Sequence, residues 1–125
     1  TAILKAKQEM ISEVLQKAYE KVMNLSDADY FELLTNLLKT YVQSGDGEIY
    51  FSEKDKQRIP ASFVEETEKI VASKGGKLTF APETKQIDGG FILVYGGIEE
   101  NCTIRAIFES KRDEWSDLVQ KVMFV

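Results

Sequence analysis

The chain has 125 residues, with 16 Lys and Arg against 21 Asp and Glu, one Cys and no His. This length suits one domain with at most an appended helix, and such a domain needs neither disulfides nor a metal to bury a core. The lack of His and of a second Cys excludes the usual zinc sites, His-based acid–base catalysis and catalytic triads. A net charge of −5 argues against nucleic-acid binding, and no apolar run is long enough to span a membrane.

Residues 1–24 are predicted to form one helix with two apolar stripes. The first stripe, at alternating steps of three and four, contains Leu4, Ile11, Leu15, Ala18, Val22 and Leu25. A second stripe beside it contains Ile3, Lys7, Met10 and Val14, to which Lys7 contributes its aliphatic stem. A surface helix on a small domain needs only one stripe. We therefore predict that the second stripe faces a partner helix, and that the domain is faced by Leu4, Ile11, Leu15 and Ala18.

Two alternatives stay open for this helix. Both stripes could form one wide face toward the core, or their two roles could be reversed. The helix is also basic within an acidic chain, through Lys5, Lys7, Lys17 and Lys21. Such a charge would favour an acidic partner helix, although exposed ion pairs contribute only about 0.3–0.5 kcal/mol each.

Three serines predict the starts of the next helices, because each precedes a carboxylate by three residues. Ser26 with Asp29 opens a helix that Gly45 ends. Ser52 with Asp55 opens a short helical turn before Pro60. A third pair, Ser62 with Glu65, opens a helix that closes at residues 75–76.

Four strands are predicted, at residues 48–51, 77–81, 90–95 and 102–106. The run 90–95 is continuously apolar, which predicts a central strand covered on both faces. Residues 96–101 are expected to form the turn into the last strand, in which Cys102, Ile104 and Ala106 alternate with polar residues. A final helix would begin at Phe108 or Glu109. This order predicts an α+β fold, with a four-stranded mixed or antiparallel sheet, helices packed on it and an N-terminal helix in front.

Candidate catalytic chemistry is sparse. Acidic residues near the predicted strand ends could form a carboxylate pair or a cation site, namely Asp88, Glu99, Glu100 and Glu109. Their turn positions favour solvated charges instead. Cys102 has no His to activate it and lies on the inward side of a strand, which indicates a buried structural thiol. No catalytic, cofactor-binding or metal-ligating residue is therefore predicted.

Three stretches resemble the E subunits of archaeal (A-type) and vacuolar (V-type) ATP synthases and ATPases. They are residues 89–96 (GGFILVYG), 98–104 (IEENCTI) and 106–112 (AIFESKR), and residues 6–9 and 30–34 also fit. The pattern resembles archaeal members more closely than eukaryotic ones. Family members carry a long N-terminal helix ahead of this region. The resemblance therefore implies that residues 1–24 are the end of a longer stalk helix and residues 25–125 a C-terminal globular domain.

The resemblance implies a non-catalytic peripheral-stalk (stator) subunit of a proton-translocating rotary A/V-type ATP synthase, with no cofactor. Such a subunit pairs its N-terminal helix with a second stalk subunit (G or H) in a coiled coil, and its C-terminal domain touches the B subunit of the catalytic head. It lies at the cytoplasmic face of the cell membrane, is attached to the membrane only through the complex, and binds no nucleic acid.

Two hypotheses from other classes remain. One is a small carboxylate enzyme that uses a divalent cation, suggested by Glu99 and Glu100. The other is a self-associating module, in which the second stripe of the first helix pairs with its own copy as a homodimer.

Overall fold

The computed structural model describes residues 1–123 and divides the chain into two compact units. The sheet unit comprises residues 25–104, and the terminal unit comprises residues 1–24 together with the segment from Arg105 onward. No helix among the described residues is both long and apolar enough to cross a bilayer. The predicted division into the end of a stalk helix, residues 1–24, and a globular domain, residues 25–125, stays a prediction.

The sheet unit is built on a four-stranded sheet with the order β2-β1-β3-β4. Its strands are β1 (Asp46–Tyr50), β2 (Lys77–Phe80), β3 (Gly90–Tyr95) and β4 (Ile98–Thr103). β1 pairs with β2 in parallel, whereas β1 with β3 and β3 with β4 are antiparallel. The predicted α+β class with a mixed sheet is therefore confirmed.

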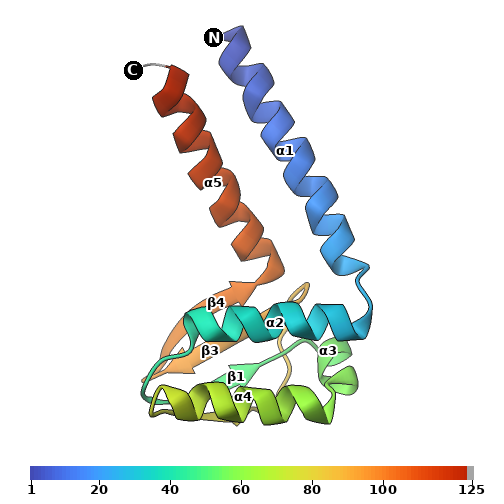
Figure 1. The fold of residues 1–125 in the computed structure, drawn as a ribbon, viewed down its shortest axis with the longest axis vertical. Helices are drawn as coiled ribbons and strands as arrows, with labels where there is room; N and C mark the ends of the chain where they lie inside the picture. The colour runs from blue at the N-terminus through green and yellow to red at the C-terminus, as the bar shows by residue number, and fades with distance from the viewer. Residues whose placement is uncertain (124–125) are drawn as a thin grey trace. The chain divides into compact units, whose positions relative to one another are not determined.

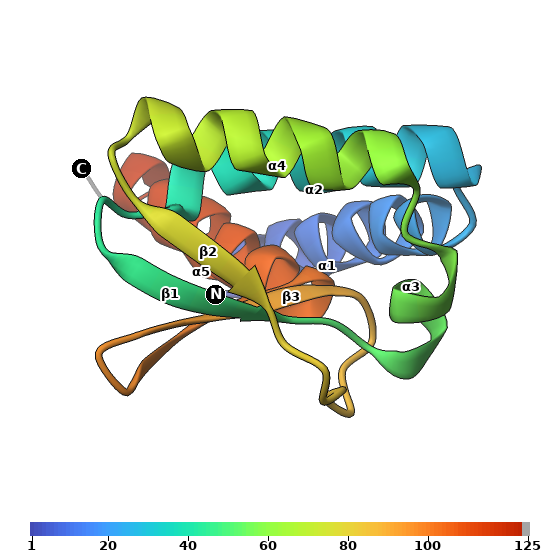
Figure 2. The same ribbon diagram turned by 90° about the horizontal axis from the view of Figure 1, so that it is seen from below.

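Two long helices, α2 (Asp27–Tyr41) and α4 (Ala61–Ser73), lie side by side over one face of this sheet (Figures 1 and 2), and the short α3 (Glu53–Arg58) follows β1. Between these layers, phenylalanine rings pack with centroids 5.2–6.4 Å apart: Phe31, Phe51, Phe63, Phe80 and Phe91. The aromatic cluster fixes where α2 and α4 sit on the sheet, because such rings bury large areas in specific geometries.

The central strand β3 is buried over its first four residues, as its apolar run predicts. On the face opposite the helices, the segment between β2 and β3 lies against the sheet through Lys85. Its ammonium lies 4.8 Å from the ring centroid of Tyr50 and 3.7 Å from a carboxylate oxygen of Glu99. Val94 and Tyr95, at the far end of the strand, are half-buried.

The predicted last strand at residues 102–106 was wrong. β4 begins at Ile98 directly after the Gly96-Gly97 turn and ends at Thr103. The final helix α5 (Ile104–Met123) starts four or five residues earlier than expected. Both glycines have positive φ, 58° and 77°, which is typical of a two-residue type I′ hairpin. The turn therefore needs only these two residues, and Ile98 pairs directly with Tyr95.

Of the three predicted helix starts, two are confirmed. The Ser26 hydroxyl accepts from the Asp29 amide at 3.3 Å, and the Ser52 hydroxyl accepts from the Asp55 amide at 3.1 Å. The start at Ser62 was wrong, because α4 begins at Ala61 with Pro60 at its N-cap and no side-chain cap. The fixed φ of proline already suits a helix start, and the Pro60 carbonyl accepts from the amides of Phe63 and Val64.

The terminal unit contains α1 (Ala2–Met23) and α5, which run in opposite directions (Figure 1). The prediction of one helix over residues 1–24 is confirmed, and the Thr1 hydroxyl caps it by accepting from the Leu4 amide at 3.2 Å. The two helices meet where the ring of Tyr19 packs edge-to-face on that of Phe108, with centroids 5.7 Å apart. Leu15 lines the same groove between them.

Candidate interaction surface

The two apolar stripes of α1 differ in exposure. In the first stripe Leu15 is 6% exposed, and Leu4, Ile11 and Ala18 are half-buried. In the second stripe the exposed fractions are 61% for Ile3, 64% for Met10 and 54% for Val14, and Lys7 is also exposed. The second stripe thus has the exposure that a partner-binding surface requires, while its predicted contact with a partner stays a prediction.

Helix geometry extends this second stripe toward the C-terminal end of α1. Continuing the same alternation of steps from Val14 leads to Lys17 and Lys21, both exposed. We call the whole line the outer stripe, and it contains Ile3, Lys7, Met10, Val14, Lys17 and Lys21. The sequence patterns identified the last two residues only as positive charge, although their heptad spacing was available as a signal.

A second exposed apolar surface lies on α5. Trp115, Leu118 and Val122 share one side of the helix at steps of three and four, and they are 41%, 59% and 71% exposed. Single exposed apolar residues are normal on a soluble protein, whereas contiguous ones mark interaction surfaces. Both helices of the terminal unit therefore offer apolar contacts beyond those that they make with each other.

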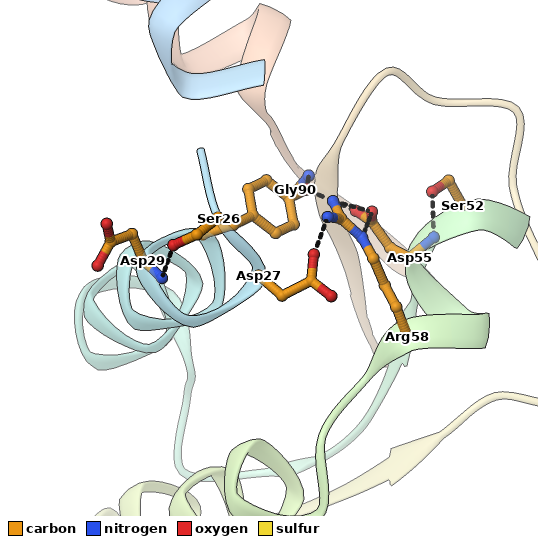
Figure 3. Close-up of polar contacts among 8 residues, drawn as sticks. Ser26, Asp27, Asp29, Ser52, Asp55, Arg58 and Gly90 are labelled. Carbon is orange, nitrogen blue, oxygen red and sulfur yellow. Dashed lines mark hydrogen bonds and ion pairs between the residues drawn. The ribbon is translucent and has the colours of Figure 1, made fainter. Parts of the chain in front are cut away.

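In the sheet unit, the main polar cluster is a buried network around Asp55 (Figure 3). The Tyr30 hydroxyl donates to Asp55 Oδ2 at 2.5 Å and accepts from the Gly90 amide at 2.8 Å. Arg58 donates to Asp55 Oδ1 through two nitrogens, at 2.8 and 3.1 Å, and to Asp27 at 2.7 Å. These contacts join α2, α3 and β3 at one point.

The network around Asp55 stabilises the fold. Asp55 is 2% exposed, and the guanidinium of Arg58 compensates its charge while lying 4.5 Å from the centroid of the Tyr30 ring. Burial, together with the hydrogen bond to Asp55, raises the pKa of Tyr30 well above its ordinary value of 10.0, so the hydroxyl stays a neutral donor. Among the described residues, no buried side-chain nitrogen or oxygen lacks a hydrogen-bond partner. The donors and acceptors here satisfy one another, which is typical of a fold-stabilising network.

The acidic residues considered as a cation site do not form one within residues 1–123, where no group of three potential metal ligands occurs. Glu99 and Glu100 are neighbours on β4, so their side chains point to opposite faces of the sheet. Glu99 lies near the ammonium of Lys85, and both of these side chains are exposed. The arrangement matches solvated surface charge.

Cys102 is fully buried on β4, as its position in the alternating pattern predicts. Burial, with a smaller contribution from the charge of Glu100, raises the pKa of its thiol to about 12. The thiol therefore stays protonated at neutral pH, whereas a nucleophilic cysteine has to be a thiolate. Its role is packing.

Comparison with known proteins gives the family. The sequence model for the ATP synthase (E/31 kDa) subunit matches residues 1–124. Over 106 residues the chain is 42% identical to the V-type ATP synthase E subunit of Acetivibrio thermocellus, covering 83% of this chain and 54% of that protein. Over 123 residues it is 37% identical to the V-type ATP synthase E subunit of Clostridium botulinum, covering 97% and 62%.

A third relative, the V-type ATP synthase E subunit of Clostridium perfringens, is 40% identical over 124 residues, covering 98% of this chain and 62% of that protein. The chain thus spans 54% to 62% of the length of these relatives. All three come from bacteria, so the expected closer resemblance to archaeal members is not borne out. The match over nearly the whole chain shows that it belongs to the family of ATP synthase (E/31 kDa) subunits.

Proposed function

We propose that this chain is the C-terminal part of a non-catalytic peripheral-stalk (stator) subunit of a proton-translocating rotary V/A-type ATP synthase. In this role it anchors the stalk to the catalytic head and keeps the head from turning with the rotor. Family membership supplies the setting. The observation that carries the proposal is the exposed line of Ile3, Met10 and Val14 on α1.

In this proposal α1 is the end of a longer stalk helix, and its outer stripe pairs with the second stalk subunit (G or H) in a coiled coil. Three apolar residues at heptad spacing suit that contact, because such a line buries itself against a second helix and leaves the rest of the surface in water. A single helix in solution would keep these side chains in contact with water. Pairing therefore removes apolar area that the chain itself leaves exposed.

The globular part, residues 25–125, touches the B subunit of the catalytic head in this assignment. A stator carries load, so its anchor must resist deformation. The close-packed aromatic core and the Asp55 network support such a role, because densely packed protein interiors have low compressibility. The complex places the subunit at the cytoplasmic face of the cell membrane, with no direct membrane contact of its own.

The test is binding of the cognate second stalk subunit, measured by sedimentation velocity and calorimetry. Wild-type chain should form a one-to-one complex. Val14→Glu should weaken it by about tenfold or more, because the variant buries an unpaired charge in an apolar seam. Gln16→Glu is the matched control, since it adds the same charge at an exposed position on another side of α1 and should bind as wild type does.

Absence of a complex at tens of micromolar would contradict the stator assignment. Equal weakening of binding by Val14→Glu and Gln16→Glu would contradict the proposal that the outer stripe is the surface that binds the second stalk subunit. Formation of a homodimer that Val14→Glu abolishes would support the self-associating module instead.

A further inference from the structure

The outer stripe of α1 has a division along its length that the stator assignment does not explain. Its N-terminal half is apolar apart from Lys7, and its C-terminal half consists of Lys17 and Lys21. Both of these lysines are exposed, and within residues 1–123 neither forms an ion pair. A basic end is unusual in a chain whose net charge is −5.

These lysines oppose pairing of α1 with its own copy. In a parallel, in-register pair each of Lys7, Lys17 and Lys21 would meet its equivalent across the seam. In an antiparallel pair centred on the middle of the stripe, Lys7 would face Lys17. Like charges held opposite one another in a seam destabilise that pairing, which is a common device against the wrong partner.

Two carboxylates lie beside the lysine end of the stripe. Glu13 and Glu20 lie along one edge, four and one residues before Lys17 and Lys21 respectively, and neither carboxylate forms an ion pair with these lysines in the described chain. The opposite edge is the half-buried first stripe, which carries no charge at Leu4, Ile11 and Ala18. A helix that lies on the outer stripe therefore meets apolar side chains first and two free ammonium groups beyond them.

We infer that the partner of the outer stripe is a heterologous amphipathic helix, with apolar residues opposite Ile3, Met10 and Val14 and carboxylates opposite Lys17 and Lys21. The inference rests on the proposed function for the presence of a helical partner, and it adds that partner's chemistry. The apolar half supplies buried area, and the basic half sets the register, because only one alignment brings both complementary halves together.

Charge reversal tests the inference against the cognate second stalk subunit. Lys17→Glu/Lys21→Glu should raise the dissociation constant by about tenfold at about 50 mM salt, since two attractions become repulsions. The matched control is Lys5→Glu/Lys54→Glu, which changes net charge equally at exposed lysines away from the stripe and should change the constant less than about threefold. Lys17→Gln/Lys21→Gln should fall between wild type and the reversal.

Salt provides a second readout. Since the Debye length falls from about 10 Å at 0.1 M salt to about 3 Å at 1 M, wild-type binding should weaken with salt more than that of the Gln variant. Melting temperatures of all variants should stay close to that of wild type, because the changed side chains are exposed. Lys21 lies in the last turn of α1, so circular dichroism should verify that each variant keeps its helix content.

The outcomes separate the inference from the function on which it rests. A complex that forms equally well, or better, with Lys17→Glu/Lys21→Glu overturns the acidic partner and leaves the stator assignment standing. Failure of wild type to bind overturns both. Concentration-dependent homodimerisation of wild type through the outer stripe, strengthened by high salt, would overturn the selection against self-pairing.

Discussion

Tyr30 lies where three elements of the sheet unit meet, because its hydroxyl joins Asp55 of α3 to Gly90 of β3. Replacing Tyr30 with Phe would remove the donor to Asp55 and leave the Gly90 amide without an acceptor. Leaving such buried groups unpaired costs about 1–3 kcal/mol each. Because two groups lose a partner, urea unfolding at pH 7 should show Tyr30→Phe destabilised by about 2 kcal/mol or more, with the fold retained.

The same side chain makes stability sensitive to alkaline pH. Burial raises the pKa of Tyr30 above its ordinary value of 10.0, so the folded state holds this proton more tightly than the unfolded state does. The contribution of this proton to the free energy of unfolding is fully present below about pH 10. It is lost as the pH rises from there toward the pKa of Tyr30 in the folded state. Above pH 10, the free energy of unfolding of Tyr30→Phe should fall less steeply than that of wild type, by up to about 1.4 kcal/mol per pH unit. Equal slopes would mean that Tyr30 titrates normally in the folded protein.

The sequence pattern identified Asp55 only as a helix-start residue. That half of its role is confirmed by the bond from its amide to the Ser52 hydroxyl. Its carboxylate instead accepts from Tyr30, 25 residues away, and from Arg58. A contact of that sequence separation leaves no local pattern, so the buried network could not have been predicted from the sequence.

At the scale of elements, the β3–β4 hairpin depends on its glycines in two different ways. Gly90 and Gly97 both have positive φ, 74° and 77°. A Cβ at Gly90 would lie 2.3 Å from the carbonyl oxygen of Cys102 on the paired strand, whereas at Gly97 nothing lies within 4 Å. A side chain at Gly97 would therefore cause backbone strain alone, whereas one at Gly90 would cause the same strain and a steric clash.

Alanine substitution at these two glycines makes the difference measurable. Gly97→Ala should destabilise by about 1–2 kcal/mol, the cost of a left-handed conformation for a residue with a Cβ. Gly90→Ala carries the same cost and must also displace backbone atoms of β4, so it should unfold at clearly lower urea concentration or fail to fold. Equal midpoints would show that the strands separate there at little cost.

The hairpin also shows why element boundaries were harder to predict than elements. A two-glycine connection between strands is a strong hairpin signal, but residues 98–101 contain two glutamates and an asparagine, which are depleted in strands. Ile104 and Ala106 alternate like strand residues, yet Ile104 and Phe108 are equally well spaced for a helix. The strand assignment extended too far because both patterns fit the same residues. By contrast, α1 was predicted correctly because its periodicity is sustained over 22 residues.

At the scale of the whole molecule, the sequence predicted the α+β class and the family, but not which segments associate. The contact between Tyr19 and Phe108 joins helices at the two ends of the chain. Such a pairing is decided by the folding of everything between them and leaves no periodic signal. The stripes of α1 were visible in the sequence, whereas which stripe stays exposed required the structure.

The central claim is that the outer stripe of α1 meets a second stalk subunit, and site-directed cross-linking in the assembled complex tests it most directly. Val14→Cys and Glu9→Cys introduce exposed thiols on and away from the stripe. The native thiol should stay silent, since Cys102 is buried and its pKa is raised to about 12. With a reagent that joins a maleimide to a photoreactive benzophenone, which needs no cysteine on the partner, Val14→Cys should cross-link to the second stalk subunit and Glu9→Cys should not. Products of Val14→Cys that contain only two copies of this chain, or equal yields from both positions, would contradict the account.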